Sequence, residues 1–278
     1  MVAGGLARHG LPYAREIGAE AVQVFVSNPR GWALSAGDRA QDTAFRDTCG
    51  EARMPVFVHA PYLVNLGSPT EATLDKSLDC LAHSLRRGRD IGARGVVVHA
   101  GSEVTGGSYD LAIKQVHERL LPLVDSLGED DPELLVELTA GGRGSLASTP
   151  AGLSAYLDAL ERHPKVGVCV DTCHAMAAGH DLAAPGGVRR FLGAVAKAAG
   201  RGRIKLVHAN DSKDPVGSGR DRHESVGRGS IGEAAFSELF VHPATKGVPV
   251  LVETPGKPAD NARDIALLKR LRTASLEV

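Results

Sequence analysis

The sequence predicts an α/β fold of the (β/α)8 TIM-barrel type. Seven short apolar runs rich in β-branched residues alternate with segments of helical periodicity, and six of the runs end at a histidine or a carboxylate. Continuous apolar runs of this length are typical of parallel strands buried on both faces. Functional side chains of a β/α barrel lie at the C-terminal ends of its strands. The pattern therefore predicts a barrel with a polar centre in its mouth.

The predicted strands follow one another in the order of a parallel barrel. The first, 21–26, reads Ala-Val-Gln-Val-Phe-Val, and the other six lead into His59, His99, Glu137, Asp171, His208 and Glu253. Those six occupy 55–58, 95–98, 134–136, 166–170, 204–207 and 248–252.

Helices are predicted between the strands. In 70–91, Leu74, Leu78, Leu81 and Leu85 share one face, as in a helix packed on a barrel. Thr149 before Pro150 has the pattern of an N-cap followed by proline at the first helical position. The predicted helices are 70–91, 109–127, 152–162, 188–199, 233–240 and 261–271.

One strand of the expected eight is missing. It should precede Gly4, but Met1 leaves no room for it. Either the true start lies upstream of Met1 or the chain forms a gapped barrel, and we expect the first. No internal boundary is visible, so residues 1–278 are predicted to form a single domain.

Composition limits the function classes. The formal net charge is −1, so no overall basic field indicates a polyanionic partner, and any nucleic-acid contact must come from a local surface. The four cysteines form no Cys-x-x-Cys pair and are expected to be reduced core thiols. With no signal core and no membrane-length apolar run, we expect a soluble cytoplasmic protein. We also expect it to be a monomer.

The strand-end residues are all possible metal ligands, and loops add three more. His174 follows Asp171 by one helical turn, and Asp221 and His223 are spaced to face the same side of an extended segment. The candidate ligands are His59, His99, Glu137, Asp171, His174, His208, Asp221, His223 and Glu253.

This ligand set suits several divalent ions. Imidazole with carboxylate and no thiolate favours Zn²⁺, or Mn²⁺ and Fe²⁺. Nine ligands at about four per ion imply two or three metals. Three divalent ions would also overcome the mutual repulsion of the four carboxylates and leave a positive site that attracts phosphate.

Three other motifs are weaker. The Gly-x-Gly-x-x-Gly pattern at 227–232 does not follow a strand, so we interpret it as a turn and not as a dinucleotide site. The glycine-rich loop 141–144 lacks a P-loop ending, although its Arg143 could contact phosphate. Cys173 and His174 are adjacent and therefore poorly placed to act as nucleophile and base.

Three longer motifs resemble the signatures of the endonuclease IV family, which comprises apurinic/apyrimidinic (AP) endonucleases of base excision repair. They begin at His59-Ala60-Pro61-Tyr62-Leu63, at Val168 before Asp171-Thr172-Cys173-His174, and at His208-Ala209-Asn210-Asp211, with Asp221-Arg222-His223 closing the third. The resemblance implies a TIM barrel with three zinc ions. It implies hydrolysis of duplex DNA on the 5′ side of an abasic site, leaving 3′-hydroxyl and 5′-deoxyribose phosphate, and removal of 3′-blocking groups.

The resemblance also implies roles for single residues. His59, His99 and Glu137 would hold one zinc, and Glu137 would bridge to a second held by Asp171, His208 and Glu253. His174, Asp221 and His223 would hold the third. Glu253 and Glu137 would be the catalytic carboxylates, with Glu253 orienting or deprotonating the attacking water. Arg30, Tyr62 and Leu63 would insert into the DNA at the lesion.

Two departures and two alternatives remain at this point. Leu138 stands where the family usually has asparagine, so a hydrogen bond near the metal is expected to be lost, and the family's first strand is absent. A sugar-phosphate isomerase or epimerase of the xylose-isomerase-like type is one alternative, although it would not need Asp221 and His223. A non-catalytic lesion-binding protein is the other, although it would not need to keep all nine ligands.

Overall fold

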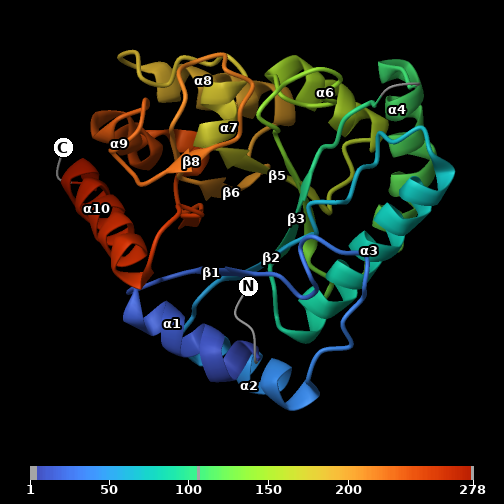
Figure 1. Cartoon of the computed structure of the whole chain (residues 1–278), viewed down its shortest axis with the longest axis horizontal. Helices are drawn as coiled ribbons and strands as arrows, with labels where there is room; N and C mark the ends of the chain where they lie inside the picture. Colours follow the sequence, from blue (N-terminus) through green and yellow to red (C-terminus); the bar gives the residue numbers. More distant parts are fainter. Residues whose placement is uncertain (1–4, 105–106, 277–278) are drawn as a thin grey trace.

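The computed structural model describes residues 5–104 and 107–276, which form one curled parallel sheet surrounded by helices (Figure 1) and a separate two-stranded antiparallel sheet. Seven strands pair side by side in the order β1-β2-β3-β4-β5-β6-β9, every pair parallel. They are β1 (Val22–Val24), β2 (Val56–His59), β3 (Gly95–His99), β4 (Glu133–Glu137), β5 (Val166–Asp171), β6 (Ile204–His208) and β9 (Val250–Leu251). The TIM-barrel prediction is confirmed for these residues.

Helices fill most connections between the strands, as predicted. They are α1 (Leu11–Glu16), α2 (Arg39–Glu51), α3 (Glu71–Asp90), α4 (Tyr109–Gln115), α5 (Leu121–Asp125), α6 (Pro150–Ala159), α7 (Thr172–Ala177), α8 (Gly187–Ala199), α9 (Glu233–Val241) and α10 (Pro258–Leu276). The Thr149 hydroxyl accepts a hydrogen bond from the Gly152 amide and caps α6, as its sequence predicts. Among the described residues, no helix has the length and apolarity needed to span a membrane.

The structure corrects the predicted helix at 109–127. A π-helical turn, Val116–Leu120, separates α4 from α5. Pro122 lies in the first turn of α5 and lacks the N–H that an uninterrupted helix would use. The chain therefore widens locally, and the Leu121 amide reaches back five residues to the Val116 carbonyl.

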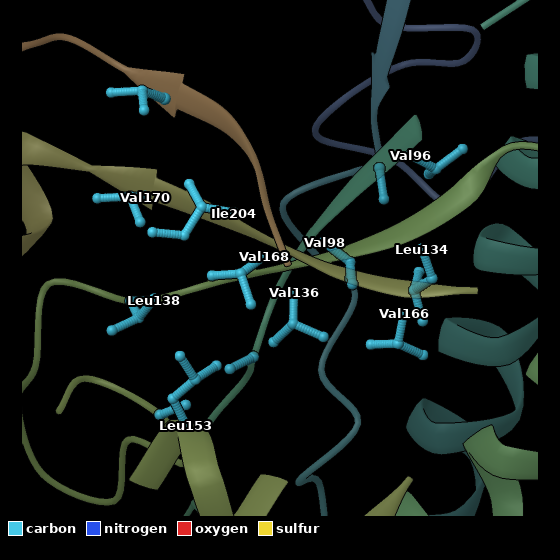
Figure 2. Packing of buried hydrophobic residues seen from close by; sticks show 14 of the residues in the cluster. Val96, Val98, Leu134, Val136, Leu138, Leu153, Val166, Val168, Val170 and Ile204 are labelled. Carbon is cyan, nitrogen blue, oxygen red and sulfur yellow. The ribbon is translucent and has the colours of Figure 1, made fainter. Parts of the chain in front are cut away.

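The strands alternate between an inner and an outer apolar layer. One inward residue from each of six strands forms the barrel interior: Phe57, Val97, Leu135, Cys169, Leu206 and Leu251. Their neighbours point outward and pack under the helices. Figure 2 shows part of this outer layer, with Val136 of β4, Val168 of β5 and Leu153 of α6 among its members. Alternation with period two therefore buries both faces of the sheet.

The barrel is open between β1 and β9, which are the two edges of the sheet. A cavity of about 730 Å³ lies there, lined by both strands and by residues of α1 and α10 such as Tyr13 and Ile265. Figure 1 shows α10 beginning beside α1 on this side, where Tyr13 donates a hydrogen bond to Asn261 in the first turn of α10. The expectation of seven strands with an unclosed side is confirmed for the described residues. Met1 to Gly4, before which the missing strand was expected, lie outside them.

Candidate metal centre

The six strand-end candidates all point into the barrel mouth, and the strand repeat explains why. Each lies two residues after a member of the interior apolar layer, as His59 follows Phe57 and Glu253 follows Leu251. Because side chains repeat every two residues along a strand, each ligand shares the inward face of its strand. The two-residue repeat that forms the apolar interior of the barrel therefore also places the six polar side chains above it.

A first group of donors comes from three neighbouring strands. The Nε2 atoms of His59 and His99 each lie 3.4 Å from Oε2 of Glu137, which is fully buried and has no hydrogen-bond partner. Zinc–ligand bonds of about 2.0–2.1 Å in a tetrahedron separate the donor atoms by about 3.3 Å. The spacing and the orphaned carboxylate oxygen therefore fit a shared metal ion.

A second group forms around Nδ1 of His208. This atom lies 2.9 Å from Oε1 of Glu137, 3.2 Å from Oε2 of Glu253 and 3.9 Å from Oδ2 of Asp171. Glu137 thus turns one oxygen toward the first group and the other toward the second. That is the geometry of a carboxylate bridging two ions.

A third group lies at the rim, with His174 on α7, Asp221 on a loop and His223 on the short strand β8 (His223–Glu224), which pairs antiparallel with β7 (Asp211–Ser212). Oδ2 of Asp221 lies 3.2 Å from Nε2 of His174, and Oδ1 of Asp221 lies 2.9 Å from Nε2 of His223. The contact to His223 is not aligned as a hydrogen bond, so its buried Nε2 has no hydrogen-bond partner in the described part of the chain. Asp171 lies between the second and third groups, 3.7 Å from Nε2 of His223. Arg222 between Asp221 and His223 forms an ion pair with both oxygens of Asp214, which fixes the loop. The structure thus brings all nine predicted ligands together.

Three imidazoles each use their second ring nitrogen to fix the ring. Nδ1 of His59 contacts the Ala60 carbonyl at 2.6 Å, Nδ1 of His174 the Leu138 carbonyl at 2.9 Å, and Nδ1 of His223 the Glu253 carbonyl at 3.2 Å. Bonds of this kind set the tautomer and leave the other nitrogen free for a metal. At position 138 the backbone makes this bond, so the contact to His174 does not depend on the leucine side chain.

Charges in the centre hold one another in their ionised forms. Burial alone raises the pKa of Glu137, but the facing imidazoles, His208 above all, hold it well below its ordinary value. Burial likewise lowers the pKa of His174, yet Asp171 and Asp221 raise it well above its usual range. Burial lowers the pKa of His99 to about 4, which keeps its ring neutral at pH 7. Without metal, the carboxylates therefore hold protons on imidazoles, and divalent cations can replace those protons.

Protein freed of metal is expected to lose stability as the pH rises from about 6.5 to about 9. Burial lowers the pKa of His223, but Asp171 and Asp221 raise it to about 9, above its unfolded value. A raised pKa stabilises the fold below the unfolded pKa, and this contribution disappears as the pH passes the folded pKa. Thermal unfolding with chelator at about pH 6.5 and about pH 9.5 should show it, and His223→Gln should reduce the difference. If the thermal stability of His223→Gln fell as much over this pH range as that of the wild type, His223 would not be the cause of the loss.

The cysteines play no part in this geometry as thiolates. All four are free and buried, as predicted. Cys169 lies beside Glu137 and His208, and Cys173 beside Asp221 and His223. Burial raises the pKa of each of these two thiols to about 12, so both stay protonated at neutral pH. Since a thiol must be deprotonated to bind a metal, the imidazoles and carboxylates are better metal ligands here than the two cysteines.

Sequence reasoning missed two polar side chains that organise the centre, the buried Asn210 and the partly buried Gln23. Asn210 donates to Oδ2 of Asp171 at 2.6 Å and accepts from the Glu253 amide at 2.7 Å. Gln23 contacts both His208 and Glu253. Gln23 had a visible signal, because it is the one polar residue in the apolar run 21–26.

The glycine-rich turn at 227–232 is a structural feature, which supports its interpretation as a turn. The buried carboxylate of Asp211 accepts backbone hydrogen bonds from Gly227, Gly229, Ile231 and Gly232. A side chain at Gly229 would place Cβ 2.3 Å from the Ser212 carbonyl oxygen. The amides that could hold a phosphate thus hold a carboxylate of the same chain.

The predicted DNA-contacting residues lie together at the rim. Arg30 lies on the loop after β1, and Tyr62 and Leu63 are 48% and 38% exposed on the loop after β2. The Tyr62 amide donates to the Pro29 carbonyl at 2.9 Å, which ties the two loops together. The centroid of the Tyr62 ring lies 5.3 Å from the ring centroids of Phe25 and His59, so Tyr62 borders the metal centre directly. Arg143 is exposed on its own loop, 141–144.

Comparisons with known proteins agree with this geometry. The profile of the family described as xylose isomerase-like TIM barrel matches residues 11–271. A Streptomyces avermitilis protein named probable endonuclease 4 is 56% identical over 272 residues, which are 98% of this chain and 88% of the relative. Endonuclease IV from Thermus thermophilus superposes with a TM-score of 0.83 at 33% identity, covering 100% of this chain and 96% of that one. A D-tagatose 3-epimerase-like protein at 18% identity and a TM-score of 0.70, covering 93% of this chain and 90% of that one, shares the fold alone.

Proposed function

The chain belongs to the endonuclease IV family, and from this premise we propose that it is a metal-dependent AP endonuclease of base excision repair. It hydrolyses the phosphodiester on the 5′ side of an abasic site in duplex DNA and leaves a 3′-hydroxyl and a 5′-deoxyribose phosphate. We extend the proposal to the removal of 3′-blocking groups, and to action as a monomer in the cytoplasm. The observation that carries it is the convergence of nine donors in three groups around Glu137 and Asp171.

The donor set supports three zinc ions, one for each donor group. The first group would hold one ion and the second group another, with Glu137 shared between them. His174, Asp221 and His223 would hold the third ion. Mn²⁺ or Fe²⁺ would suit some of these positions. Bound there, the ions would supply positive charge to the phosphate oxygens and acidify a water molecule.

Glu253 is the carboxylate best placed to handle the water. Its side chain is 22% exposed at the mouth, whereas that of Glu137 is fully buried and serves to bridge. The water oxygen bonds to phosphorus in line with O3′, the P–O3′ bond breaks, and O3′ leaves as a hydroxyl after taking a proton from solvent. Glu253 orients the water and accepts the proton that it gives up. Glu137 acts by holding the ligands of two groups in place.

The rim residues support recognition of a flipped sugar. An abasic nucleotide has no base pair to break, so turning it out of the duplex costs little, and the enzyme gains selectivity without base contacts. Arg30, Tyr62 and Leu63 would fill the gap left in the duplex and hold the DNA bent, a use of wedge side chains known in other DNA-bending proteins.

Arg30→Ala and Tyr62→Ala are each expected to weaken binding to abasic duplex by about tenfold or more, since each removes a wedge side chain. Hydrolysis of a small phosphodiester such as bis(p-nitrophenyl) phosphate should change less than about twofold, because it has no duplex to hold. Binding by fluorescence anisotropy and turnover of both substrates measure this. Equal losses on the two substrates would place these residues in the chemistry or in the fold.

The function is tested with a duplex that contains one tetrahydrofuran abasic analogue. This analogue cannot undergo β-elimination, so cleavage must be hydrolytic. We expect a cut on its 5′ side and a product that a DNA polymerase extends, as a 3′-hydroxyl requires. Binding without any cut would favour a non-catalytic lesion-binding protein.

The isomerase or epimerase alternative fits less well. The similarity to the epimerase-like structure, at 18% identity, extends to the fold alone. We expect isomerases and epimerases of this type to use one or two metals. They would have no use for the third donor group at Asp221 and His223 or for the exposed Tyr62. Turnover of a ketose or sugar phosphate, with the tetrahydrofuran duplex left intact, would reverse this preference.

A further inference from the structure

Gln23 makes two contacts to the second donor group. Its Oε1 lies 2.9 Å from Nε2 of His208, and its Nε2 donates to Oε1 of Glu253 at 2.7 Å. One planar amide thus joins two metal-ligand candidates from different strands, β6 and the end of β9. Its own strand is a third, β1.

The strand repeat places Gln23 there. Ala21 packs against the interior apolar layer, and Gln23 follows it by two residues, the same step that separates each strand-end ligand from that layer. Gln23 therefore holds on β1 the position that His59, His208 and Glu253 hold on their strands. Because an amide is a poor zinc donor compared with imidazole or carboxylate, its role there is to contact ligands.

His208 differs from the other fixed imidazoles in how its ring is held. His59, His174 and His223 keep Nε2 for the metal and bond a backbone carbonyl through Nδ1. His208 turns Nδ1 toward Glu137 and Glu253, so a neutral ring that binds metal through Nδ1 must carry its hydrogen on Nε2, where Gln23 accepts it. The ring of His208 thus depends on a side chain for an interaction that the backbone supplies elsewhere.

We propose that Gln23 is a positioning residue of the metal centre, which fixes the tautomer of His208 and aims the Glu253 carboxylate. The amide also spans the open side of the barrel, because β1 and β9 are sheet edges that do not pair with each other. It links residues 230 positions apart where backbone pairing between the two strands is missing. This proposal rests on the proposed function, since it concerns the ligands of the same site.

Gln23→Leu approximates the size of the side chain and removes both hydrogen bonds. We expect it to weaken retention of one metal ion by about 10- to 100-fold, the usual cost of losing a partner that orients a ligand. Competition with a chromogenic zinc chelator measures retention without any assay of activity. The kcat on the tetrahydrofuran duplex should fall by a similar factor while KM changes less than about threefold.

Gln23→Glu separates the two contacts. Its carboxylate can still accept from His208 but cannot donate to Glu253, so metal retention should recover toward wild type while kcat stays low. Gln115→Leu is the matched control. Gln115 is another partly buried glutamine, it donates to the Ser68 carbonyl at 3.0 Å away from the donor groups, and its loss should change neither quantity.

Thermal unfolding of the metal-free variants separates positioning from folding. If Gln23→Leu retained zinc as tightly as the wild type and had the same kcat, the proposal would be overturned. It would also be overturned if the metal-free Leu variant unfolded well below metal-free wild type and the Glu variant recovered nothing, because the role would then be structural. Wild-type protein that retained no zinc would overturn the proposed function along with it.

Discussion

Complete removal of metal is expected to lower cleavage of the tetrahydrofuran duplex by at least about 1000-fold, because the ions supply both the charge that stabilises the phosphate and the acidified water. Oε2 of Glu137 is buried without a hydrogen-bond partner among the described residues, as expected of a metal ligand. The measurement is the single-turnover rate after prolonged dialysis against chelator, with elemental analysis of the same sample.

Restoration by different ions tests the donor chemistry. Zn²⁺ should recover activity and Mn²⁺ should recover part of it, whereas Mg²⁺ should fail, since Mg²⁺ prefers oxygen ligands and every group of clustered donors includes at least one imidazole. Protein that stayed active without metal, or that Mg²⁺ alone restored, would contradict the assignment.

Glu253→Gln is expected to lower kcat by about 1000-fold or more, because it removes a ligand charge and the carboxylate that handles the water. Binding of abasic duplex should stay within about tenfold, since the rim residues are untouched. Glu118→Gln on the helical surface, where Glu118 forms an exposed ion pair with Lys114, is the matched control and should leave both unchanged. Near-normal turnover of Glu253→Gln would show that this carboxylate is not catalytic.

The barrel and the ligand set could be predicted from the sequence because both follow from one repeat. An apolar run that ends in a ligand places the ligand on the inward face, two residues beyond a core side chain such as Leu135 or Leu206. Helices 70–91, 188–199 and 233–240 were likewise predicted to within one or two residues, and the first two have regular apolar faces.

The remainder depends on the three-dimensional arrangement. The helix α2 follows an Asp38 cap but has a mixed composition, and its bounds were not predicted. The ends of β1 and β9 shorten to Val22–Val24 and Val250–Leu251 because each strand pairs on one side. The roles of Gln23 and Asn210 depend on which ring nitrogen and which carboxylate oxygen face them, and no spacing along the chain specifies that.

The metal content of active protein tests the central claim most directly. Purified protein that cleaves the tetrahydrofuran duplex should contain about three divalent ions per chain, as nine ligands with one bridging carboxylate require at about three to four ligands per ion. Elemental analysis calibrated against quantitative amino-acid analysis gives this ratio. Fully active protein with about one ion or fewer per chain would contradict a centre built from three donor groups.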